Sequence, residues 1–402
     1  MQIEKIMRAI GTATRMILES GGETYRAEET ALHMARGFGI QDVEVFAMPT
    51  GIMLTLNQGE DSMTRIIRIH KGETNLTRLD ECNRISRQVA EGKLTPEETI
   101  GRLQRIADDQ GYAPWLMVAA FAVSCGFFCV MFNGRVPDLL VACFIGFVSR
   151  LVMNLLTAHQ VPGMLSGMML GFLMTLISQL FGTLIPHLNT EAIVSGALMP
   201  LLPGLAMTAA IRDTIRGDLV SGGAKVTEAG MTAVMLAAGA AVMLAISPLP
   251  QIHEVFEPLC VPVKLTATFI ATASFGVLMN IRWKNILFGA VLGTVGYGMY
   301  LLFDETVGAF FIAAMFMAIL SEGTARLMKC TATILITPSI IPLVPGLGLY
   351  RTMLYLVQSN YRACAQTGIY TCLGILCIAL ALTISAVLFV NISRHSAGAK
   401  RK

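Results

Sequence analysis

Pro200-Leu201-Leu202-Pro203-Gly204 and its counterpart Pro342-Leu343-Val344-Pro345-Gly346 each stand inside an apolar run long enough to cross a lipid bilayer. Proline lacks an amide proton and its ring clashes with the carbonyl four residues earlier. Two prolines and a glycine in mid-run therefore predict an opened helix rather than a bent one. Matching interruptions in two halves of a hydrophobic chain indicate a transporter's binding site. We expect both PxxPG motifs to break transmembrane helices.

The composition is that of a membrane protein. Of 402 residues, 54% are hydrophobic and 14% are charged, which is far too apolar for an ordinary soluble protein. More than half of the charged residues lie within residues 1–112, so we expect a soluble domain before a membrane domain. The first residues lack the apolar core of a signal peptide, which predicts a cytoplasmic first domain. The nine cysteines form no CxxC pair, and we expect them to pack rather than to hold a metal or form disulfides.

Residues 1–112 predict a small α+β domain. Periodic apolar positions indicate helices ending near Ser20 and Arg36, and two more over 75–91 and 96–109. Three β-branched or alternating runs, 43–48, 52–57 and 63–70, predict a strand meander.

The densest polar cluster of this domain, residues 19–29, has two interpretations. A hydrolase would need a nucleophile and a base, but only His33 and His70 are available and no GxSxG motif is present. We favour a helix capping box with surface salt bridges.

Ten apolar runs follow, each near the ~20 residues that a bilayer requires. They are 114–132, 138–158, 163–186, 190–211, 226–247, 260–281, 284–302, 306–324, 331–357 and 362–391. Five spans per copy of the motif would make the second copy enter from the opposite side, as in a 5+5 inverted repeat with two broken helices. The expected domains are 1–112, a first repeat over 113–250, a second over 251–393, and a basic tail over 394–402.

The distribution of basic residues tests this topology independently. With residue 112 in the cytoplasm, the cytoplasmic segments hold most basic residues beyond it: Arg212, Arg216, Lys225, Arg282, Lys284, Arg326, Lys329, Arg394, Lys400, Arg401 and Lys402. The outer side holds Arg135, Lys264, Arg351 and Arg362. We therefore expect a multi-pass protein of the cell (inner) membrane with both termini in the cytoplasm.

The expected substrate site lies between the broken helices. The half-helices that begin near Gly204 and Gly346 would direct two positive amino ends, each roughly +0.5 charge, to the centre of the bilayer, where they suit a carboxylate. We assign substrate binding to Pro200, Pro203, Gly204, Pro342, Pro345 and Gly346. Arg150, deep in the second run, joins this set or reaches the cytoplasmic interface instead. Glu228 is the expected proton-coupling carboxylate.

The runs Ser20-Gly21-Gly22-Glu23-Thr24-Tyr25-Arg26-Ala27-Glu28-Glu29 and Ala47-Met48-Pro49-Thr50-Gly51-Ile52, with the duplicated PxxPG, resemble the threonine/serine exporter family. The resemblance covers nearly the whole chain. It implies a cytoplasmic domain, sometimes suggested to be hydrolase-like, and ten spans that export threonine and serine by the proton motive force. Some members are split into two subunits that export succinate. This chain resembles the fused form, and the split point would fall near residues 248–260.

We therefore expect a secondary exporter and not an enzyme, with no cofactor and no nucleic acid partner. Its expected partners are a small-molecule substrate, the lipid bilayer and protons. The sequence leaves open whether the chain forms a homo-oligomer. The alternatives are a dicarboxylate exporter, a membrane-anchored hydrolase acting through residues 1–112, and a passive channel. Ten spans and the missing nucleophile-base pair argue against the hydrolase.

Overall fold

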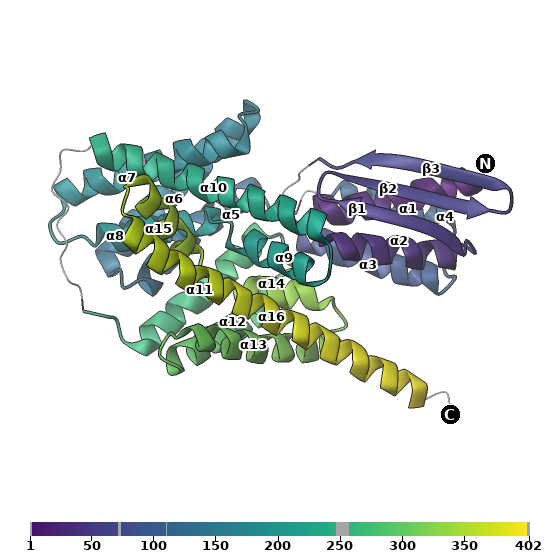
Figure 1. Ribbon diagram of the computed structural model, residues 1–402. Coiled ribbons are helices and arrows are strands. Elements are labelled where there is room, and N and C mark those ends of the chain that lie inside the picture. Colours follow the sequence, from purple (N-terminus) through teal and green to yellow (C-terminus); the bar gives the residue numbers. More distant parts are fainter. Residues whose placement is uncertain (1, 71–73, 110, 247–256, 400–402) are drawn as a thin grey trace.

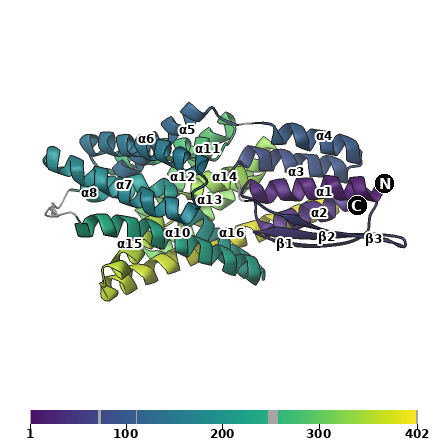
Figure 2. The ribbon, with the colours of Figure 1, turned by 90° about the horizontal axis from the view of Figure 1, so that it is seen from above.

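The computed structural model describes residues 2–70, 74–109, 111–246 and 257–399. An α+β unit lies at one end of a long helical bundle (Figures 1 and 2). Following the expectation from the sequence, we call residues 2–70 and 74–109 the soluble unit. The bundle end that contacts it is the near end, and the opposite end is the far end. The expected boundary between residues 250 and 251 lies outside the described residues, as do most of the expected split region and Lys400, Arg401 and Lys402.

The soluble unit contains four helices and one sheet. The helices are α1 (Gln2–Glu19), α2 (Thr24–Gly37), α3 (Leu76–Ala90) and α4 (Pro96–Ala107). Strands β1 (Asp42–Met48), β2 (Gly51–Gln58) and β3 (Asp61–Arg68) pair antiparallel in the order β1-β2-β3, which confirms the predicted meander. The sheet forms one outer layer, α1 and α2 the middle, and α3 and α4 the other side (Figure 2).

The sequence explains these layers directly. Ile10 and Ile17 are fully buried on one face of α1, and Leu54 and Leu56 alternate with more exposed residues along β2. Both sets join one hydrophobic core, as their helical and strand periods require. At α4, Thr95 and the first-turn carboxylate of Glu98 form a capping box ahead of the helix.

Within the described residues, eight helices are long and apolar enough to cross a bilayer, and a bent pair raises this number to nine. The eight are α5 (Pro114–Met131), α6 (Val136–Ala158), α7 (Gly163–Leu184), α10 (Leu219–Ile246), α11 (Val261–Leu278), α12 (Trp283–Leu302), α13 (Val307–Met328) and α16 (Tyr361–Ala399). The expected span over 331–357 is broken into two short helices by its prolines, as predicted, and this pair is not among the helices counted as candidate spans. The ten-span, 5+5 arrangement stays a prediction.

Small residues let the bundle helices approach each other closely. A Cβ added at Gly171 of α7 would overlap the carbonyl oxygen of Leu236 in α10, and one at Gly239 would overlap that of Met168. On the other side of the bundle, a Cβ at Gly293 of α12 would lie 3.1 Å from Ser339 Cα. Cys125 and Cys129 are fully buried in this packing. These contacts fix the frame that holds the two interrupted helices.

Candidate functional site

Both PxxPG motifs interrupt helices, as predicted. The first separates α8 (Thr190–Leu198) and the short 3-10 turn η1 (Met199–Leu201) from α9 (Gly204–Ile215), and the chain bends by 50° there. The second separates α14 (Ala332–Ile340) from α15 (Gly346–Val357). In each case a glycine begins the second half-helix directly after a proline, where the first amide groups have no partner within the helix.

The two interruptions touch each other. A Cβ added at Gly204 would overlap Val344 Cγ1 and lie 3.6 Å from Gly346 Cα. In the reverse direction, a Cβ at Gly346 would lie 3.2 Å from Leu202 Cβ and 3.8 Å from the sulfur of Met199. Segments far apart in the sequence therefore meet at buried glycines, and this crossing is the candidate site.

From the crossing, the two second halves run to opposite ends of the bundle. α9 ends at the near end, where Arg212 contacts the soluble unit, whereas Arg351 of α15 pairs with Glu191 at the start of α8, at the far end. The amino ends of α9 and α15 therefore start close together and point their positive dipole ends toward the crossing. A carboxylate at the crossing would experience both.

The backbone carbonyls near the crossing are less free than an opened helix suggests. The carbonyls of Met199, Ile341 and Val344 accept turn hydrogen bonds from Leu202, Val344 and Gly346 at 3.3, 3.3 and 2.7 Å. In the described part of the chain, the carbonyl of Leu202 accepts no backbone hydrogen bond. Leu202 is therefore the best placed of these carbonyls to receive a donor from a ligand.

Arg150 and Glu228 lie on different helices around the site. Arg150 is half-buried on α6, which packs mainly against α5, α7 and α8. Glu228 is half-buried on α10, which packs against α7 and against both second half-helices, α9 and α15. The helix of Glu228 is thus the more direct neighbour of the two halves that start at the crossing.

At the near end, a buried ion pair links the soluble unit to the first broken helix. Glu23, only 5% exposed, pairs with Arg212 in the last turn of α9 and also accepts a hydrogen bond from Arg26 Nε at 2.9 Å. The Glu23 side chain makes no capping hydrogen bond to α2. The expected capping box with surface salt bridges is therefore wrong, because this carboxylate points into the contact with the bundle.

The neighbouring residues extend this contact along the chain that follows α9. The guanidinium of Arg216 stacks over the Tyr25 ring, 3.9 Å from its centroid. The Thr24 hydroxyl donates to Asp218 Oδ2 at 2.9 Å. Burial opposes ionisation of Asp218, but hydrogen bonds from Ser221 and Thr24 outweigh it and hold the pKa below its usual value.

The soluble unit also holds the near end of the second broken helix. The carboxylate of Asp80 accepts hydrogen bonds from the backbone amide, at 3.0 Å, and the hydroxyl of Thr331, the residue that precedes α14. The amide of Leu76 donates to the carbonyl of Met279 at 3.0 Å. The same α+β unit thus contacts the near ends of both broken helices.

At the far end, a different ion pair joins the two broken helices. Glu191 in the first turn of α8 pairs with Arg351 of α15, and their side chains are 71% and 40% exposed. This ion pair joins the two broken helices directly, without the soluble unit. Because water reaches both groups, it contributes little to stability.

The comparisons with known proteins agree with this architecture. The family described as "Putative threonine/serine exporter" matches residues 8–247, and a second description, "Threonine/Serine exporter, ThrE", matches residues 264–388. The chain belongs to the threonine/serine exporter family. No solved structure matches it significantly. Its family and its apolar helices make it a multi-pass membrane exporter.

Curated relatives of this family member differ in their substrates. A "Threonine/serine exporter" of Corynebacterium glutamicum is 21% identical over 88% of this chain and 76% of its own length. A "Probable succinate transporter subunit YjjP" of Klebsiella aerogenes is 25% identical over 51% of this chain and 80% of its own length. The protein of the same description from Escherichia coli is 23% identical over 57% of this chain and 90% of its own length. These names indicate transporters rather than enzymes.

The two soluble stretches that resemble the exporter family meet in the structure. Oε1 of Glu28 accepts a hydrogen bond from the backbone amide of Ala47 at 2.9 Å, and burial raises the pKa of this carboxyl. Ser20 is buried, whereas His33 and His70 are exposed. Sequence reasoning missed the contact of residues 23–26 with the bundle, and only the unusual density of charge beside Gly21-Gly22 could have indicated it.

Proposed function

We propose that this chain is a secondary exporter of threonine and serine, driven by the proton motive force, whose substrate binds between the two broken helices. The contact of Gly204 with the segment around Gly346 supports this most strongly. Crossed half-helices in mid-bundle give the combination of positive amino ends and a carbonyl without a backbone hydrogen bond, that of Leu202, which suits an amino acid. The carboxylate faces the starts of α9 and α15, and the ammonium group faces the carbonyl of Leu202.

The proposed topology is the 5+5 inverted repeat, with residues 1–112 and the tail in the cytoplasm and the protein in the cell (inner) membrane. The opposite courses of α9 and α15 and the excess of Arg and Lys at the near end support this orientation. In this arrangement the near end faces the cytoplasm.

Two ionisable residues complete the proposed mechanism. Glu228 carries the coupling proton, because its helix contacts both α9 and α15 and can respond to their movement. Arg150 assists the substrate carboxylate from α6. Pro200, Pro203, Pro342 and Pro345 keep the helices open, and the two glycines let the openings touch.

The test uses a strain that lacks its own exporters and is fed a threonine-containing dipeptide. Expression of this chain is expected to lower intracellular threonine, and Gly204→Leu is expected to abolish the effect because its side chain would overlap Val344. Gly346→Ala is the milder change, since its Cβ would lie 3.2 Å from Leu202 Cβ, which is tight but does not overlap. Undiminished export by Gly204→Leu and Gly346→Leu would remove the crossing from the mechanism.

A dicarboxylate such as succinate is the second candidate substrate, favoured by the two curated relatives named as succinate transporter subunits. Two positive half-helix ends suit two carboxylates as well as one. The same strains separate the candidates. Raised succinate efflux with unchanged threonine and serine efflux would reverse the ranking.

A further inference from the structure

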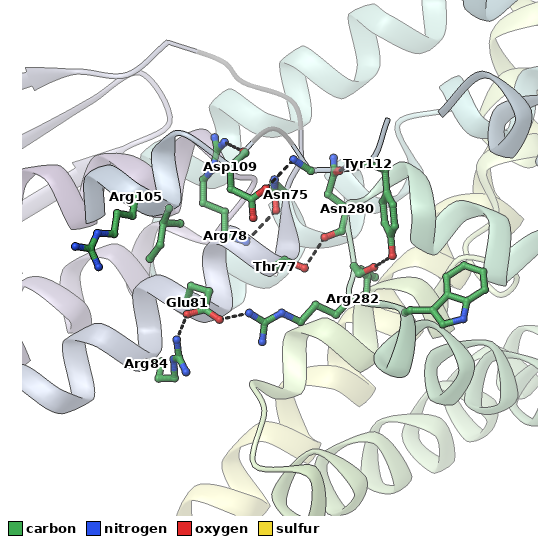
Figure 3. Close-up of a pocket in the computed structure, with 14 residues that line it drawn as sticks. Asn75, Thr77, Arg78, Glu81, Arg84, Arg105, Asp109, Tyr112, Asn280 and Arg282 are labelled. Atoms are coloured by element: carbon green, nitrogen blue, oxygen red, sulfur yellow. Dashed lines mark hydrogen bonds and ion pairs between the residues drawn. The ribbon is translucent and has the colours of Figure 1, made fainter. Parts of the chain in front are cut away.

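A pocket of about 500 Å³ lies where the soluble unit meets the near end of the bundle (Figure 3). Its walls come from the start of α3, the end of α4, residues 111–112, residues 280–282 between α11 and α12, and Trp283 at the start of α12. The hydroxyls of Thr77 and Tyr112 donate to the carbonyls of Asn280 and Ile281 at 2.6 and 2.7 Å. These hydrogen bonds fix the two sides of the pocket against each other.

The described lining of this pocket carries a surplus of positive charge. Its charged residues are Arg78, Arg84, Arg105, Arg282, Glu81 and Asp109. The Glu81 carboxylate pairs with both Arg84 and Arg282 (Figure 3). Nη2 of Arg78 donates to the backbone carbonyl of Asp109 at 3.0 Å, while its buried Nε has no hydrogen-bond partner among the described residues. The pocket therefore offers arginine donors that a bound anion would use.

Two tryptophans place this pocket at the membrane surface. The chain contains only two, Trp115 and Trp283. Each is 71% exposed and lies in the first turn of an apolar helix, α5 or α12. Trp115 follows the pocket residue Tyr112 by three positions, and Trp283 directly follows Arg282 and lines the pocket itself. Exposed tryptophan at the start of a spanning helix is typical of the headgroup layer. The pocket opening therefore lies at the level of lipid phosphates.

We infer that this pocket binds the phosphate headgroup of an anionic lipid from the leaflet on the near side. A phosphate takes charge-assisted hydrogen bonds from arginines, and basic residues at this depth attract anionic lipids. The bound headgroup would bridge the end of α4 and the loop before α12, and so fasten the soluble unit to the second half of the bundle. The inference rests on the proposed function only for the statement that this leaflet is cytoplasmic.

The test measures tryptophan fluorescence of the full chain in a nonionic detergent. Phosphatidylglycerol with brominated acyl chains is added, and brominated phosphatidylcholine serves as the neutral comparison. We expect phosphatidylglycerol to quench at a lower lipid content. The double variant Arg84→Gln with Arg105→Gln should raise the half-quenching content by roughly 10- to 30-fold, because Arg282 still neutralises Glu81. Arg87→Gln with Arg102→Gln removes the same charge from α3 and α4 outside the pocket and should leave it unchanged.

The remaining arms separate a lipid from free phosphate and from general surface charge. Equal quenching by both lipids, or equal losses in both double variants, would overturn the inference. Inorganic phosphate is tested alone by thermal unfolding. Stabilisation by phosphate that requires Arg84 and Arg105, without selectivity for phosphatidylglycerol, would show that the anion is soluble and the lipid assignment wrong. None of these results depends on export, so they stand apart from the test of the crossing.

Discussion

The two broken helices are held differently at their two ends. At the near end, Glu23 of the soluble unit reaches Arg212 from a buried position, with side chains 7% and 16% exposed. At the far end, Glu191 and Arg351 join the broken helices directly in an exposed pair. Removing one partner of a buried pair leaves an uncompensated charge and costs about 3–5 kcal/mol, whereas an exposed pair contributes about 0–1 kcal/mol. The broken helices are therefore held by a strong ion pair at the near end and by a weak one at the far end.

The largest effect is expected from Glu23→Gln. This change leaves Arg212 buried opposite a neutral amide, so the free energy of unfolding should fall by about 3 kcal/mol or more. Export should also fall, because α9 loses its buried contact with the soluble unit at the near end. Thermal unfolding of the purified chain and efflux from cells would measure both. Glu29→Gln, on the exposed face of α2, is the matched control, and equal behaviour of the two variants would contradict the buried tie.

The helix interruptions and the near-end contact differ in how far the sequence could predict them. The PxxPG pair predicted both interruptions because proline and glycine act on the local backbone. Glu23 and Arg212 lie far apart in the chain. The sequence could not distinguish their contact from a salt bridge on the surface of the soluble unit, because both need the same residue types. The sequence pattern around residues 19–29 therefore predicted the correct helices but the wrong partners. The expected fourth and ninth spans, 190–211 and 331–357, met a related limit, because a helix opened by two prolines no longer has the length by which a span is recognised.

A smaller effect is expected from acid titration at the same near-end contact. The pKa of Asp218 is lowered from its ordinary 3.8, so its contribution to stability is present above that value and is lost as the pH falls through the lower pKa of the folded state. Asp218→Asn should flatten this part of the profile. The unfolding midpoint of the purified chain, followed as the pH is lowered, measures the change. Asp61→Asn, at the exposed start of β3, should keep the wild-type slope; a flattened slope there too would rule out a specific role for Asp218.

The smallest effect is expected from Glu191→Gln at the far end. Because both side chains are exposed, the free energy of unfolding should change by less than about 1 kcal/mol, and export should stay within about fivefold of wild type. Arg351→Gln should behave in the same way, and the double variant should add nothing. A loss as large as that of Glu23→Gln would show that the far end is the fastened one and would reverse the comparison.

The contact between the two interruptions also limits how this chain can change over time. A methyl group on Gly204 would intrude on Val344, and one on Gly346 would crowd Leu202, so each glycine borders the other copy's opening. Substitutions at the two positions should show strong epistasis, because the first displaces the segment that the second would meet. The segments around Gly204 and Gly346 must therefore change together, whereas residues that do not touch across the crossing can change independently. A larger side chain at either glycine would therefore need a compensating change in the segment that it meets.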